Sequence, residues 1–185
     1  MVSPESTDRG LSIYRQVLKG DFDRLAPELR AFHDVQGHAR FHGKCRIESA
    51  RGPMGRLLCG LLRLPRAVDD AGFVFELTAT PGHEVWIRHF PGRAMRSTMR
   101  AADGQLVERI GPVSLRFSLT ADAGNLAMQL SRLTVLGLRW PRAWTPQVWG
   151  NERAGGGMLH FDAGARFRRL GVLTAYRGFL NVASR

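Results

Sequence analysis

The first third of the chain changes from helical spacing of apolar residues to strict alternation. Across residues 11–32 apolar residues recur at helical spacing, with a break at Gly20 and with Pro27 suited to a first helical turn. Across residues 41–47 every second residue is apolar or small, as on a strand with one solvated face. These patterns predict a helix, a kink, a second helix and then a strand.

A third helix is predicted between Gly52 and Pro65. Its apolar face consists of Met54, Leu57, Leu58, Leu61 and Leu62. Such a face most often packs on the core, but it also suits a lid over a cavity. Because Arg56, Arg63 and Arg66 flank these leucines, weak contact with an anionic membrane surface is a third interpretation.

Turn residues divide the rest of the chain into short alternating segments. The turns are Pro81-Gly82, Pro91-Gly92, Asp103-Gly104, Gly111-Pro112 and Asp122-Ala123-Gly124. We therefore expect about eight or nine antiparallel strands. Residues 138–150 hold three tryptophans among Pro141 and Pro146, which predicts a covering loop or helical turn rather than a strand.

These elements predict an α+β fold that is mainly antiparallel β. So many strands cannot stay flat, so we expect a single curled sheet or barrel-like wrap with two or three helices, one packing on the concave side. The expected organisation is a flexible N-terminus at residues 1–10 and one domain at residues 11–185. The length of 185 residues fits this single domain.

Composition adds a strong positive charge. The formal net charge is +11, and Lys19 and Lys44 are the only lysines among 27 basic residues, so the chain is arginine-rich. The excess of arginine over lysine is typical of compositional bias, which accounts for part of this charge. Because the chain also contains no run of four basic residues, nucleic acid is an unlikely partner. Cys45 and Cys59 are too few for a disulfide scaffold and fit a reducing compartment, so we expect a cytoplasmic protein with no transmembrane segment.

Several stretches resemble a bacterial family known as domain of unknown function 4166. They are Tyr14-Arg-Gln-Val-Leu, Phe22-Asp-Arg-Leu-Ala-Pro-Glu-Leu-Arg, Gly52-Pro-Met-Gly-Arg-Leu-Leu with Leu64-Pro65, Trp86-Ile-Arg-His-Phe-Pro-Gly, Leu106-Val-Glu-Arg-Ile-Gly-Pro and Tyr176-Arg-Gly-Phe-Leu. The resemblance implies a domain found alone or fused to saccharopine-dehydrogenase-like modules. This chain lacks a Gly-x-Gly-x-x-Gly nucleotide motif, and Gly155-Gly-Gly157 fits a hairpin loop, so we expect no dehydrogenase activity and no cofactor.

The candidate ligand-binding residues lie in these family-like stretches and in one neighbouring strand. They are Trp86, Arg88, Phe90, Glu108, Phe117, Tyr176 and Arg177. The aromatic residues would line an apolar cavity, and Arg88 or Arg177 would meet a polar head group. An internal salt bridge that includes Arg88 and Glu108 is the plainer interpretation.

No catalytic motif and no metal-ligand spacing stands out. His38 and His42 lie on one strand face, roughly 13 Å apart at about 3.3 Å per residue, too far to share a metal ion. The sequence therefore favours a non-enzymatic binder of a hydrophobic or amphipathic small molecule, with an acyl or isoprenoid chain as examples. The alternatives are a docking module for a separate dehydrogenase-like protein and a nucleic-acid binder with a basic surface.

Overall fold

The structure, a computed structural model, describes residues 10–62 and 64–182. The expected flexible segment at residues 1–10 therefore lies almost wholly outside the described ranges. The helical elements are α1 (Ile13–Leu18), η3 (Lys19–Arg24), α2 (Pro27–His33), α3 (Pro53–Leu61) and η4 (Arg142–Trp144). The strands are β1 (Gly37–Ser49), β2 (Val68–Thr80), β3 (His83–Phe90), β4 (Arg93–Ala102), β5 (Gln105–Ile110), β6 (Val113–Asp122), β7 (Asn125–Val135), β8 (Leu138–Arg139), β9 (Gln147–Gly155), β10 (Met158–Phe167) and β11 (Gly171–Asn181).

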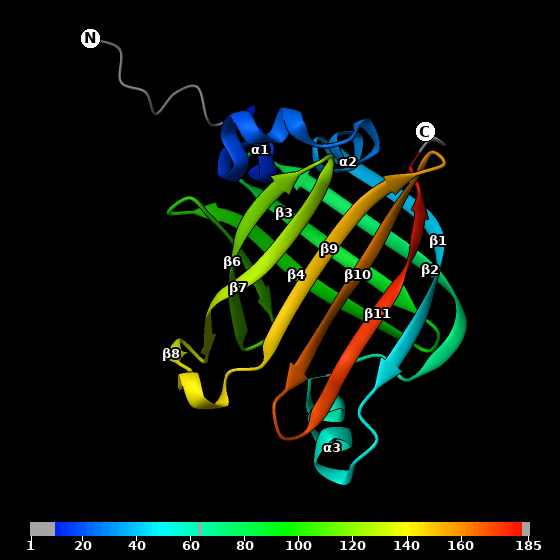
Figure 1. The fold of residues 1–185 in the computed structure, drawn as a ribbon, viewed down its shortest axis with the longest axis vertical. Coiled ribbons are helices and arrows are strands. Elements are labelled where there is room, and N and C mark those ends of the chain that lie inside the picture. Colours follow the sequence, from blue (N-terminus) through cyan, green and yellow to red (C-terminus); the bar gives the residue numbers. More distant parts are fainter. Residues whose placement is uncertain (1–9, 63, 183–185) are drawn as a thin grey trace.

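The strands form one antiparallel sheet that closes on itself (Figure 1). The sheet order is β6-β5-β4-β3-β2-β1-β11-β10-β9-β7-β8, and an additional pairing of β6 with β7 completes the barrel. Only the two-residue β8 stands outside the ring. The predicted α+β, mainly antiparallel, barrel-like fold is therefore confirmed, although the described residues form eleven strands instead of eight or nine.

The sequence-based interpretation of residues 138–150 was wrong at its C-terminal part. Strand β9 begins at Gln147, directly after Pro146, and pairs with both β7 and β10. Pro146 precedes the ladder, so it removes no strand hydrogen bond. The strand was hidden because its inner face carries Gly150 and Glu152 where the alternation rule requires apolar residues.

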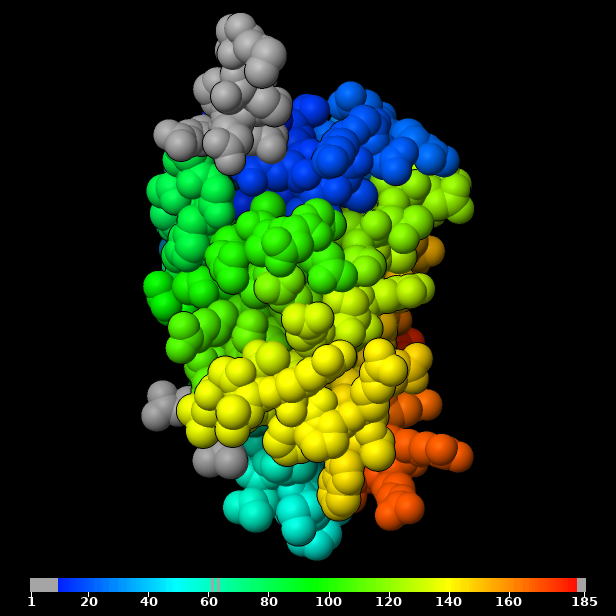
Figure 2. Space-filling model, turned by 90° about the vertical axis from the view of Figure 1, so that its left-hand side faces the viewer, coloured from blue at the N-terminus to red at the C-terminus, as the bar shows by residue number. Residues whose placement is uncertain are grey.

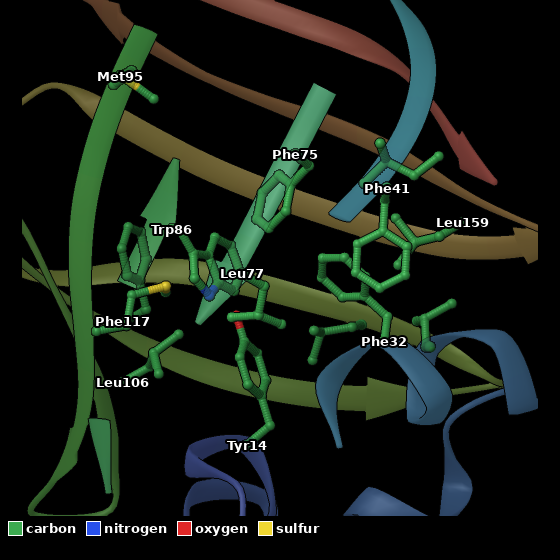
Figure 3. Close-up of a cluster of buried hydrophobic side chains, with 14 of the residues drawn as sticks. Tyr14, Phe32, Phe41, Phe75, Leu77, Trp86, Met95, Leu106, Phe117 and Leu159 are labelled. Carbon is green, nitrogen blue, oxygen red and sulfur yellow. The ribbon is translucent and has the colours of Figure 1, made fainter. Parts of the chain in front are cut away.

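Helices α1, η3 and α2 close one end of the barrel, which we call the capped end (Figure 1). Their apolar side chains are buried, and Tyr14 and Phe32 project from α1 and α2 among the strands (Figure 3). The amide of Ala26 donates to the carbonyl oxygen of Gly124 at 2.9 Å, which ties the helices to the β6–β7 turn. The predicted helix, kink and second helix thus seal one end of the barrel.

Packing differs between the two ends of the barrel interior. Towards the capped end Leu77, Trp86, Leu106 and Leu159 are almost completely buried. The other end, which we call the α3 end, is formed by the loops at residues 50–67, 91–92, 111–112, 136–146 and 168–170. Apolar core-contacting residues near it are only partly buried, and we call them the inner wall: Ile110, Val113, Leu130, Val148, Ala165 and Phe167.

Helix α3 buries only part of the face that the sequence pattern defined, with Leu58 and Leu62 partly buried against the core. The side chain of Leu61 lies outside what the structure describes. Met54 and Leu57 are largely exposed, while Gly55 and Cys59 face the barrel. The Cys59 thiol donates to the carbonyl oxygen of Leu173 at 3.2 Å, which anchors α3 to the start of β11. Core packing therefore explains only part of this helix, because Met54 and Leu57 remain exposed.

Candidate functional site

Six of the seven predicted ligand-binding residues point into the barrel. Trp86, Arg88 and Phe90 alternate along the inner face of β3, and all three are buried. The inward residues of the remaining strands are Glu108 on β5, Phe117 on β6 and Tyr176 on β11. These six residues therefore share the barrel interior, although they come from separate strands.

Arg177 lies instead on the outer face. Neighbouring residues of a strand point to opposite faces, so the inward Tyr176 turns Arg177 towards solvent. There the Arg177 guanidinium lies 3.9 Å from the Glu48 carboxylate. It lines an outer groove of about 700 Å³ that crosses β6, β7, β9, β10 and β11. The expectation that Arg177 faces a cavity inside the barrel was therefore wrong.

Arg88 and Glu108 form the predicted internal ion pair. Arg88 Nη2 donates to Glu108 Oε1 at 3.1 Å, and Nη1 donates to Ser97 Oγ at 3.0 Å. The guanidinium carbon also lies 5.0 Å from the centre of the Trp86 ring. Burial works against the charged guanidinium, but Tyr176 and Glu108 outweigh it and raise the pKa of Arg88. A permanent cation is thus held inside the barrel, paired with the Glu108 carboxylate.

Four aromatic rings form a layer beside Arg88. The ring centres of Phe73 and Phe90 are 5.1 Å apart, and those of Phe90 and Tyr176 are 5.5 Å apart. Phe161 closes the layer, because its ring centre lies 5.3 Å from Phe73 and 6.0 Å from Tyr176. These rings come from β2, β3, β10 and β11, so the layer spans the barrel between opposite walls.

Tyr176 is the least buried residue of the predicted interior set. Its ring belongs to the aromatic layer, yet it remains partly exposed although it points inward. Burial raises the pKa of its phenol, with Arg88 acting in the opposite direction. Tyr176 therefore presents a neutral hydroxyl group near the buried cation.

A second polar group, beneath the capped end, was not identified from the sequence. His33 Nε2 lies 2.5 Å from Glu152 Oε2, and the Tyr14 ring centre lies 3.8 Å from that of His33. Trp86 Nε1 donates to Glu84 Oε2 at 2.8 Å. These residues come from α1, α2, β3 and β9, so no short motif could have brought them together.

Two groups of this second cluster have strongly shifted pKa values. Burial raises the pKa of Glu84 to about 7, against weaker opposing effects of Trp86 and His33. Burial, together with the charges of Glu152, Glu84 and Glu108, raises the pKa of Tyr14 well above its usual value. The Tyr14 hydroxyl has no hydrogen-bond partner among the described residues. The cluster therefore holds Tyr14 neutral and leaves Glu84 close to half protonated near pH 7.

The chemistry available in the interior is recognition of charge and shape. Arg88 and Tyr176 offer donors to an anion, and the aromatic layer and inner wall offer apolar contact. Within the described ranges, no three His, Cys, Asp or Glu side chains are grouped so that they could hold a metal ion. The helices described here include none that is long and apolar enough to cross a membrane.

The fold and interior define a helix-capped antiparallel barrel that encloses paired charges. The chain belongs to the family described as domain of unknown function (DUF4166), whose sequence profile matches residues 25–180. No curated protein matches the chain at a significant level. The chain is similar to the crystal structure of Rv2717c from M. tuberculosis, with 12% identity, a TM-score of 0.44 and coverage of 84% of this chain and 97% of that chain.

Proposed function

We propose that the barrel binds an amphipathic small molecule, with an anionic head group at Arg88 and Tyr176 and an apolar tail along the inner wall. The observation that carries this proposal is the position of a buried, paired guanidinium beside an aromatic layer in which Phe161 and Tyr176 remain partly exposed. Aromatic and aliphatic walls with a few convergent polar groups are typical of small-molecule sites. A non-enzymatic role fits this arrangement, and both cysteines are free, which fits the proposed cytoplasmic location.

The first test is native mass spectrometry of gently purified protein, followed by denaturation and organic extraction. The proposal expects a reproducible extra mass that is released on denaturation. A protein without bound molecules that also fails to bind the fluorescent fatty acid 11-(dansylamino)undecanoic acid would overturn it. That result would favour the alternative expectation, docking to a dehydrogenase-like protein.

A pair of matched variants locates the head-group site. Tyr176→Phe removes the hydroxyl beside Arg88, whereas Tyr14→Phe removes a hydroxyl from the sealed capped end. We expect Tyr176→Phe to weaken binding of the dansyl fatty acid by about tenfold, the worth of one hydrogen bond to a charged group. Tyr14→Phe should bind it as the unmodified protein does. Equal effects of the two variants would argue against the proposed orientation.

A double variant tests the cation without leaving a buried charge unpaired. Arg88→Met combined with Glu108→Leu replaces the ion pair with apolar residues of similar size, a change that proteins often tolerate. We expect this variant to fold and to lose preference for the fatty acid over the matching uncharged alcohol. An unchanged preference would show that Arg88 does not contact the head group.

A further inference from the structure

The α3 end gathers almost all of the large apolar side chains that the described surface exposes. Leu11 at the capped end is the one exception. The others are between 49% and 78% exposed and are Met54, Leu57, Leu136, Leu138, Trp144 and Leu170. They come from α3, the β7–β9 connection and the β10–β11 turn, and Figure 2 shows the first two segments as neighbouring cyan and yellow surfaces at one end. Three separate segments therefore place exposed apolar side chains at the same end of the barrel.

The same loops carry unpaired positive charge. Their exposed arginines are Arg51, Arg56, Arg66, Arg139, Arg142, Arg168 and Arg169. In the described part of these five loops there is no Asp or Glu, and none of these arginines forms an ion pair. The nearest carboxylates along β1 and β2 are already matched: Glu48 with Arg177, Asp69 with Arg46 and Asp70 with Lys44.

The capped end has a different composition. Its helices carry Asp21, Asp23, Glu28 and Asp34 among their basic residues. Arg15 is bound by Asp34, with Nε 3.0 Å from Oδ1, and Arg24 lies near Asp21. Unbalanced charge and exposed apolar residues therefore coincide at one end only, although the whole chain is basic.

We infer that the α3 end docks on an anionic lipid bilayer. Arginines beside exposed Leu, Met and Trp match an interface in which apolar side chains enter the acyl boundary while cations meet phosphate groups. A shallow, open depression lined by Arg139, Trp140, Pro141 and Arg142 lies at this end and offers two guanidinium groups to a head group. A nucleic acid would use the arginines but not the protruding Leu57 and Leu138. This inference does not depend on the proposed interior ligand.

The test is flotation of the protein with vesicles of phosphatidylcholine alone and with vesicles containing 30% phosphatidylglycerol. We expect at least tenfold tighter binding to the anionic vesicles. The apolar variant Leu57→Ser/Trp144→Ser and the charge variant Arg56→Gln/Arg142→Gln should each lose tenfold or more in binding. The control Leu11→Ser/Arg153→Gln makes the same two kinds of change away from the α3 end and should bind normally.

Three results would overturn the inference. The first is equal binding to neutral and anionic vesicles. The second is loss of binding in the charge variant while the apolar variant binds normally, because that pattern indicates a polyanion. The third is tighter binding to double-stranded DNA than to anionic vesicles, if the Leu57→Ser/Trp144→Ser variant binds that DNA as tightly as the unmodified protein does. All of the substituted side chains are exposed, so circular dichroism should show unchanged folding.

Discussion

His33 and Glu152 are 119 positions apart in the chain, yet His33 Nε2 lies 2.5 Å from Glu152 Oε2 inside the barrel. The contact joins α2 of the capped end to β9 of the wall. Both side chains are buried, so removing one of them would leave the other as a buried polar group without this hydrogen bond. The pair therefore fixes the position of the helices over the barrel.

Replacing Glu152 with Leu should loosen the capped end. We expect a loss of about 1–3 kcal/mol in the free energy of unfolding, because His33 loses its partner in a buried site. Hydrogen exchange followed by mass spectrometry should show faster exchange in α2 than in β3. The control Asp34→Asn affects a partly exposed ion pair on the same helix and should cost less than about 1 kcal/mol. Slow exchange of α2 in the Glu152→Leu variant would contradict this role.

Glu84 should make the protein less stable as the pH rises. Its pKa is about 7 in the folded protein against an ordinary value of 4.5, so folding favours the protonated form. The associated stability is fully present below about pH 4.5 and is lost as the pH rises through 7. Glu84→Gln keeps an acceptor for Trp86. Its free energy of unfolding should be about 3 kcal/mol higher than that of the unmodified protein at pH 8, and the two should differ little at pH 4.5.

Urea unfolding of both proteins between pH 4 and pH 8 measures this difference. Glu48→Gln serves as the control, because Glu48 is on the outer face. Its free energy of unfolding should stay close to that of the unmodified protein at every pH. Parallel stability curves for Glu84→Gln and the unmodified protein would mean that Glu84 ionises normally in the barrel.

The Arg88–Glu108 pair should show strong coupling in a double-mutant cycle. Arg88→Met alone leaves the buried Glu108 carboxylate unpaired and should destabilise the protein by about 3–5 kcal/mol. The double variant with Glu108→Leu should recover most of this loss, since no buried charge remains. Chemical denaturation measures each corner of the cycle, and additive effects would refute the coupling.

Gly178 should not tolerate a side chain. A Cβ atom there would collide with the carbonyl oxygen of Lys44 and with Cys45 on the neighbouring strand, which are backbone and inner-face atoms without room to move. We expect Gly178→Ala to destabilise the protein by about 1–3 kcal/mol. The control Gly72→Ala, in a strand position with open space around its Cβ, should be neutral or slightly stabilising. Thermal unfolding of the two variants distinguishes these outcomes.

The turns and the inner face of β3 were predictable because their signals are local. Asp103-Gly104, for example, adopts positive φ at both residues (51° and 67°), as a tight hairpin requires. Alternation likewise placed Trp86, Arg88 and Phe90 together on one face. Such features depend on neighbours within a few residues, and so the sequence alone defines them.

The polar cluster beneath the helices could not be predicted in this way. Glu152 lies on a strand whose inner face begins with Val148 and Gly150, so the strand does not show a clear alternation of apolar and polar residues. Its partner His33 is on a helix that is distant in the sequence. Arg177 was misplaced for a different reason, because family-like stretches do not say which of two adjacent residues faces inward. The register with β10 and β1 settles that choice only in the folded barrel.

The closing pair β6–β7 also determines how copies of this protein can meet. Each strand of the ring is hydrogen-bonded to a neighbour on both sides over at least part of its length, so among the described strands only the two-residue β8 pairs on one side alone. Open edges are the usual starting points for aggregation by strand addition. With most of the ring backbone paired in this way, association with another molecule depends mainly on side chains, and the exposed apolar ones are concentrated at one end of the barrel.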